Sequence, residues 1–153
     1  MTKPSDRLKE IDITLPAVPK PVASYVPCVR HGDLLLLSGQ LPLQNGKIAY
    51  TGLAGHEQQL EAAQEAAKLC AINAIAVGAG AAGGIDNLDR VLKVVVYVAS
   101  HEGFTDPHLV ANGASNFLKE VFGDAGAHAR AAVTVAGLPL NATVEIDVTF
   151  SMK

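Results

Sequence analysis

The segment between Leu88 and Ala99 constrains the fold of this chain more than any other part of the sequence. It holds the run VLKVVVYVA, which is rich in β-branched residues. Branched side chains are stiff at their first torsion and pack well on a pleated surface, so such runs favour strands. We therefore expect a central strand over residues 88–99, around which the other elements must pack.

Further strands are expected wherever similar runs are bounded by turn residues. They cover residues 24–30, 34–40, 47–50, 130–136 and 143–151. The first two flank a tight turn at His31-Gly32-Asp33, and Asn45-Gly46 marks another hairpin turn. Pro27 cannot donate a ladder hydrogen bond, which places the first strand at an edge or makes it irregular there. The run LLLL shows no alternation of apolar and polar residues, so we expect that strand to be covered on both faces.

Two helices are indicated by a change in hydrophobic periodicity. Residues 57–79 carry Ala, Leu and Val at helical spacing, with Glu, Gln and Lys on the other side. The glycine-rich stretch 78–84 is expected to end this helix. The pair Asp106-Pro107 is typical of a helix start, and the second helix should run to about residue 122.

The order of these elements predicts an α+β fold, a mixed sheet with two helices packed on one face. Residues 1–20 are polar and contain proline, and we interpret them as an N-terminal arm outside the core. Residues 21–153 are expected to form a single domain, as the length of 153 residues allows.

Composition excludes several classes of function. The net charge is −3, aromatic residues make up 5% and tryptophan is absent, which disfavours binding to nucleic acid. Neither a signal peptide nor a membrane-spanning stretch is expected, so we predict a cytoplasmic protein without membrane partners. Hydrophobic residues reach 49% and charged residues only 18%, which hints at surface hidden in an oligomer.

Cofactor and metal sites are not indicated. Glycines 78, 80 and 83 fit the GxGxxG register, but the dinucleotide motif needs a strand before it and a helix after it. The five histidines and two cysteines have no metal-ligand spacing, so we expect no metal and no cofactor. His128 shares strand parity with Arg130 and could line the same pocket, although the pattern favours a solvated loop histidine.

Arg130 and Glu145 are the candidate functional residues. Arg130 opens one of the closing strands, and its planar guanidinium fits a carboxylate bidentately. Glu145 lies in an apolar strand, so its carboxylate must face solvent, a partner or a site. A surface salt bridge for Arg130 and a solvent-facing position for Glu145 remain open. From pattern alone, the chain is a small anion-binding α+β domain.

The combination of motifs resembles the reactive intermediate deaminase family, also called YjgF. The resemblance rests on Tyr25, the SGQ of residues 38–40, Asn73 in the first long helix, the Arg130 strand, and GLP followed by VEID. It covers about residues 21–150, and the separation of Arg130 from Glu145 matches the motif of the family.

This resemblance implies a chorismate-mutase-like fold, a homotrimer with clefts between subunits, and hydrolysis of 2-imino or enamino acids to 2-oxo acids and ammonia without a cofactor. By the same resemblance, Arg130 would bind the substrate carboxylate and Glu145 would position water. Tyr25 and the backbone at Gly39 would line the cleft.

Several positions depart from the family pattern. Ala23-Ser24 replaces Gly-Pro, Ala132 replaces a common cysteine, Ala111-Asn112-Gly113 matches the second helix poorly, and the loop over 123–129 is wider. A non-catalytic trimer that binds small carboxylates is therefore the alternative function, and RNA cleavage is a distant third. The particular imino acid, its pathway and the role of the N-terminal arm are left open.

Overall fold

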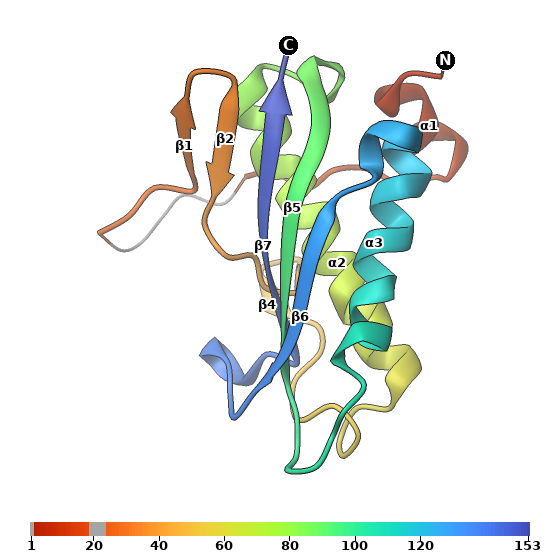
Figure 1. The fold of residues 1–153 in the computed structure, drawn as a ribbon, viewed down its shortest axis with the longest axis vertical. Coiled ribbons are helices and arrows are strands. Elements are labelled where there is room, and N and C mark those ends of the chain that lie inside the picture. Colours follow the sequence, from red (N-terminus) through yellow and green to blue (C-terminus); the bar gives the residue numbers. More distant parts are fainter. Residues whose placement is uncertain (1, 19–23) are drawn as a thin grey trace.

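The computed structural model describes residues 2–18 and 24–153 (Figure 1). The helices and strands in chain order are α1 (Pro4–Glu10), β1 (Cys28–His31), β2 (Leu34–Leu37), β3 (Leu43–Gln44), β4 (Lys47–Ile48), α2 (Leu60–Ala82), β5 (Leu88–Ala99), α3 (Pro107–Phe122), β6 (Ala129–Val135) and β7 (Val144–Met152). Short 3₁₀ turns cover Ile85–Asn87, Gly123–Gly126 and Pro139–Asn141.

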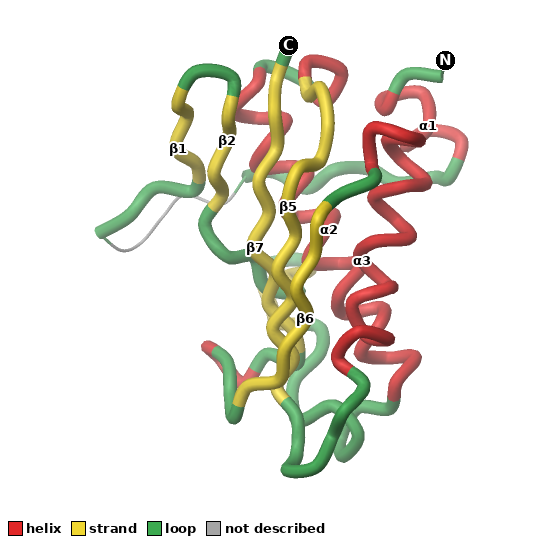
Figure 2. The backbone as a smooth tube through the Cα atoms, in the orientation of Figure 1, coloured by secondary structure: helices red, strands yellow, loops and turns green. Residues whose placement is uncertain are grey.

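The main sheet has the strand order β1-β2-β7-β5-β6. β5 pairs antiparallel with β7 and parallel with β6, so the sheet is mixed. Both long helices lie on one face of this sheet, and among the described residues no long helix lies on the other face, as Figure 2 shows. The predicted α+β class is confirmed, and so are the central position of the strand over residues 88–99 and the edge position of β1.

The core lies between the sheet and the two helices. Alternate residues of the central strands are fully buried there, including Val94, Val96 and Val98 of β5. Four residues of β7 alternate in the same way: Val144, Ile146, Val148 and Phe150. Full burial of each such side chain contributes about 1.5–3 kcal/mol. The alternation leaves the intervening residues on the open face, which decides where the polar groups go.

Helix α2 ends within the glycine-rich stretch 78–84, as predicted, but runs to Ala82 rather than residue 79. Gly78 and Gly80 lie inside it, and Gly83 ends it in the left-handed conformation with φ 76°. A Cβ at Gly78 would come within 3.0 Å of the Phe150 ring, so this glycine lets the helix lie close to the sheet. The GxGxxG register therefore falls in a helix and its cap. By length and composition α2 could cross a membrane, but 67% of the apolar window is buried inside the fold, as in a core helix.

The start of the chain differs from the expected arm. Pro4 takes the first helical turn of α1, and Leu8 is buried at 5% exposure in the main core. The Ser5 hydroxyl donates to Asp86 at 2.7 Å, which ties α1 to the turn before β5. The interpretation of residues 1–20 as lying outside the core is thus wrong for Leu8, because an amphipathic turn covers the end of α3. The predicted boundary at residues 20/21, and Ala23, lie outside the described residues.

The expectation that the LLLL strand is covered on both faces is wrong for this chain. Leu35 and Leu37 are buried, whereas Leu34 and Leu36 are 40% and 46% exposed. The physical reason is that both helices pack on the same face of the sheet. β1 and β4 are also shorter than predicted, but the Asn45-Gly46 turn is confirmed, with φ of 52° and 76° at its two residues.

The crossing of α2 and α3 depends on Gly113. A Cβ at this position would collide with the backbone carbonyl of Gln64 on α2. We expect Gly113→Ala to destabilise the fold by about 1–3 kcal/mol, although alanine is the better helix former. Chemical denaturation measures the loss. The exposed neighbour Asn116 provides the control, because Asn116→Ala should change the unfolding free energy by less than about 0.5 kcal/mol. Equal stability of both variants would contradict the prediction.

Candidate functional site

Arg130 lies on the edge strand β6 and points toward α3. Its Nη1 donates to Asn112 Oδ1 at 2.8 Å and to Ser115 Oγ at 3.1 Å. Its Nη2 donates to the backbone carbonyl of His108 at 3.3 Å. All three acceptors come from one side of α3, where residues three and four apart are neighbours. The arginine is therefore held by its own subunit through three hydrogen bonds.

The hydrogen-bond inventory of Arg130 leaves one side of the guanidinium free. A guanidinium has five N–H donors in a fixed plane. Both Nη1 donors and one Nη2 donor are used by α3, and the described residues provide no partner for Nε–H or the second Nη2–H. Donors on neighbouring nitrogens of this group suit the two oxygens of a carboxylate. Arg130 is exposed, so an anion can reach them.

His128 belongs to the same cluster. Its Nε2 lies 2.9 Å from Ser115 Oγ and its Nδ1 lies 2.7 Å from the Gly126 carbonyl. His128 lies in the loop after α3, as the pattern favoured, but it is half-buried rather than fully solvated, because its ring contacts Ser115 and the Gly126 carbonyl.

Glu145 lies in a hollow on the open face of the sheet. The hollow has a volume of about 310 Å³ and is lined by Leu37, Gly39, Tyr97, Leu138, Glu145 and Asp147. A Cβ at Gly39 would collide with the Glu145 carboxylate. Gly39 thus lets this carboxylate lie against the backbone where the β2 strand ends. We expected a glycine here to let a ligand or another part of the backbone come close. The group that comes close is the Glu145 side chain.

Burial raises the pKa of Glu145 above its ordinary value, and the negative charge of Asp147 raises it further. The two carboxylates share one face of β7 because they are two residues apart in a strand. Both effects disfavour the charged form. A proton is therefore bound at Glu145 at higher pH than at an exposed glutamate.

One chain does not bring Arg130 and Glu145 together. Arg130 pairs with Val94 on the helix side of the sheet, whereas Glu145 pairs with Tyr97 on the open side. Tyr25 is 61% exposed, in the segment before β1, and it does not line the hollow that holds Gly39 and Glu145. The predicted site residues therefore lie at separate places in the single chain, with only Gly39 and Glu145 in contact.

Four further polar residues lie at these places and were not predicted from the sequence as site residues: Tyr97, Asn112, Ser115 and Asp147. Strand parity could have found Asp147 beside Glu145. Asn112 and Ser115 lie on the same side of α3, but only the packing of α3 against β6 places that side next to Arg130. Tyr97 required the register between β5 and β7.

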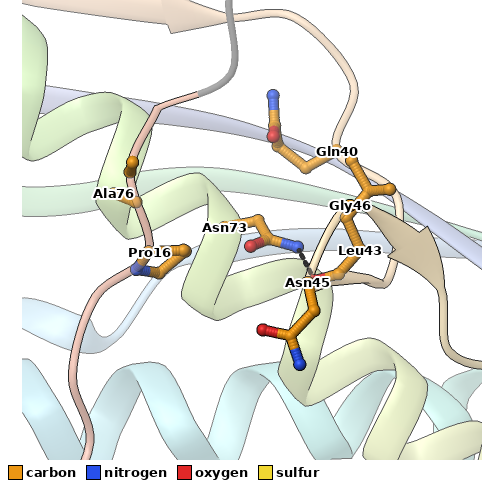
Figure 3. A pocket seen from close by; sticks show the side chains of 8 residues that line it. Pro16, Gln40, Leu43, Asn45, Gly46, Asn73 and Ala76 are labelled. Carbon is orange, nitrogen blue, oxygen red and sulfur yellow. Dashed lines mark hydrogen bonds between the residues drawn. The ribbon is translucent and has the colours of Figure 1, made fainter.

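A second hollow of about 110 Å³ lies between the N-terminal segment, the β3–β4 hairpin and α2 (Figure 3). Asn73 is its buried polar residue. The Nδ2 atom donates to the carbonyls of Leu41 and Leu43, both at 3.0 Å, so Asn73 holds the hairpin against α2. Within the described part of the chain, no group of three or more His, Cys, Asp or Glu residues is arranged to hold a metal ion.

The fold and the anchored arginine define an α+β domain of the chorismate-mutase-like type. A sequence profile of the family described as YjgF/chorismate mutase-like, putative endoribonuclease, matches residues 5–150. The chain therefore belongs to the YjgF family, also called Rid. Membership supports a general role in imine or enamine deamination or in small-molecule binding.

Individual proteins agree with this assignment. Protein TCP17 of Trypanosoma cruzi is 41% identical over 92% of this chain and 88% of its own length. A RutC family protein of Pyrococcus horikoshii is 30% identical over 92% of this chain and 95% of its own.

Two crystal structures share the fold over nearly the whole chain. A protein of unknown function from Agrobacterium tumefaciens is 47% identical with a TM-score of 0.88, and covers 97% of this chain and 91% of its own. A putative endoribonuclease from Shewanella oneidensis is 28% identical with a TM-score of 0.94, over 99% of this chain and 100% of its own.

The raised pKa of Glu145 predicts a pH-dependent stability effect. Above that pKa the folded state holds a carboxylate that the unfolded chain solvates better, so stability falls as pH rises through this window. We expect Glu145→Gln to raise the melting temperature at pH 7. The gain should vanish below about pH 4, where the carboxyl group is protonated in both states.

Glu57→Gln is the matched control, in which the change in melting temperature at pH 7 should have the opposite sign. The Leu53 N–H donates to Glu57 at 2.7 Å and lowers the pKa of that carboxyl. Its contribution to stability is present at neutral pH and is lost as pH falls through the lowered pKa. This variant should therefore melt at a lower temperature at pH 7. A loss of stability in Glu145→Gln at pH 7 would contradict the prediction and indicate a cationic partner for Glu145.

Proposed function

We propose that this protein hydrolyses small 2-imino acids to 2-oxo acids and ammonia, in clefts formed between the subunits of a homotrimer. The observation that carries the proposal is Arg130, which α3 holds by three hydrogen bonds while two of its donors stay available. A fixed cation with two neighbouring donors is suited to a small carboxylate. Membership of the YjgF family supplies the reaction class.

In this proposal Arg130 binds the carboxylate of the substrate and fixes the adjacent imine carbon. The hydrogen bonds from α3 are made before the substrate arrives, so little side-chain freedom is lost on binding. Positioning of this kind is an effective part of catalysis when the reacting group is already electrophilic. A protonated imine meets this condition.

Glu145 supports the water step. Water adds to the imine carbon and gives up a proton as the new C–O bond forms, while the C=N electron pair passes to nitrogen. The resulting carbinolamine loses ammonia as its C–N bond breaks, and the hydroxyl proton passes to the released ammonia, which leaves as ammonium, as the C=O bond forms. Glu145 has a raised pKa, so it can accept the first proton and return it to the departing nitrogen. No oxidation occurs in either step.

The assembly is part of the proposal because Arg130 and Glu145 lie on opposite sides of their own sheet. A second copy that supplies Glu145 and Gly39 to the Arg130 of the first would complete a cleft. Apolar residues on the open face support such an assembly: Val29, Leu34, Leu36 and Val133 are 40–54% exposed. Burial of such a patch between copies is the usual reason for its presence. Tyr25 would reach a cleft only through a neighbouring copy.

A non-catalytic role in carboxylate binding is the second candidate. The specific observation in its favour is Ala132, which follows Arg130 on the same side of β6 and packs against the core without a reactive group. RNA cleavage has weaker support. The family description contains the term endoribonuclease, but the net charge is −3, and phosphate binding depends on cationic side chains.

The test is ammonia release from 2-iminobutanoate generated enzymatically in place. We expect Arg130→Ala to lower kcat/KM about 100-fold or more, because a charge-assisted bidentate contact is lost. Arg130→Lys should lose about tenfold, since the charge stays but the planar fork does not. Arg30→Ala is the control and should behave as the natural protein, because this exposed arginine lies on β1 at the opposite edge of the sheet and donates only to Gly32 of its own turn.

Two outcomes would reject parts of the proposal. Unchanged ammonia release in Arg130→Ala would exclude Arg130 as the carboxylate-binding group. Binding of 2-oxobutanoate without acceleration of ammonia release, in an intact oligomer, would favour the binding protein over the deaminase.

A further inference from the structure

We propose that Ser115 and His128 are positioning residues that fix the guanidinium of Arg130, and that His128 does so as its neutral Nδ1–H tautomer. Neither residue belongs to the motifs that place the chain in its family. The relevance of this cluster for catalysis rests on the proposed function. The arrangement itself rests on the distances described above.

The Gly126 carbonyl fixes the direction of the hydrogen bond at Nδ1, and the neutral tautomer that we propose then fixes the direction at Nε2. The Gly126 carbonyl is only an acceptor, so the Nδ1 atom of His128, 2.7 Å away, must carry a proton. In a neutral ring Nε2 is then an acceptor, and the Ser115 hydroxyl at 2.9 Å must donate to it. The lone pairs of Ser115 are left to accept from Arg130 Nη1 at 3.1 Å. The hydrogen bonds thus all run in one direction, each residue donating to the next: Arg130 to Ser115, Ser115 to His128, and His128 to Gly126.

His128 controls the rotation of the Ser115 hydroxyl. A serine within a helix can otherwise donate to the carbonyl four residues earlier, which here belongs to Ala111. Such a bond would draw the oxygen away from Arg130 and weaken one of its three anchors. With the hydroxyl proton directed to His128, the oxygen presents its lone pairs to the guanidinium. Arg130 needs this support because it stands on an exposed edge strand.

The wide loop after α3 provides the geometry. Gly123 ends the helix with φ 61°, and the 3₁₀ turn Gly123–Gly126 folds the chain back along the last turn of α3. A Cβ at Gly126 would collide with the backbone carbonyl of Leu118, so only glycine allows this close return. The return aims the Gly126 carbonyl at His128. The 3₁₀ turn therefore holds the histidine ring beside Ser115.

The experiment measures binding of 2-oxobutanoate by calorimetry in four variants of the cluster and one control variant. We expect His128→Ala and Ser115→Ala to weaken binding about 5- to 20-fold, because one anchor of a charged hydrogen-bonding group is lost. His128→Gln can place an amide oxygen near the position of Nε2, and Ser115→Thr keeps the hydroxyl. Both should recover affinity to within about threefold of the natural protein. His56→Ala, an exposed histidine in the loop before α2, is the control and should bind normally.

Nitrogen NMR of the imidazoles gives a readout that a purely structural role would not produce. The Nδ1–H tautomer is expected for His128 in the natural protein, and Ser115→Ala should alter the Nε2 signal while the fold stays intact. An Nε2–H tautomer, or normal binding in His128→Ala, would overturn the proposal. If the binding pattern holds and ammonia is not released, the deaminase assignment fails while the positioning of Arg130 stands.

Discussion

The antiparallel pairing of β5 with β7 is the interaction on which the rest of the structure depends. These two strands form the centre of the sheet, and their alternate residues build the core under both helices. Because strand side chains alternate strictly, the same pairing that buries Val96 and Ile146 turns Tyr97 and Glu145 to the open face. A slip of one residue would bury Glu145 and expose the core, so the register is strongly determined.

The parallel pairing of β6 with β5 has the opposite consequence for Arg130. Its partner Val94 faces the helices, so the arginine emerges on the helix side and meets α3 at the sheet edge. The two most informative polar residues of the chain are thus separated by the sheet. A single subunit has an anchored cation on one side and a carboxylate hollow on the other, and the proposed reaction depends on a second subunit to face one with the other.

Arg130 and Glu145 are prepared for the proposed reaction in different ways, Arg130 by pre-organisation and Glu145 by desolvation. Arg130 cannot lose its charge, and its preparation is geometric: three acceptors on α3 restrict a flexible side chain. The described part of the chain offers Glu145 no such partners, and its preparation is electrostatic. Burial against Gly39 and the charge of Asp147 raise its pKa, which suits a group that exchanges a proton. The two groups match a reaction that holds an anion and moves protons of water.

Much of the fold follows from the sequence by local rules. The β-branched run predicted β5, Asp106-Pro107 predicted the start of α3, and Asn45-Gly46 predicted its turn, because each depends on the conformational preferences of neighbouring residues. The resemblance carried by Arg130 and Glu145 also predicted the family correctly. The exposure of Leu34 and Leu36, the burial of Leu8, and the partners of Arg130 and His128 were decided only by tertiary packing. These features depend on which face of a strand is covered and which residues far apart in the chain meet, and local preferences hold no information about either.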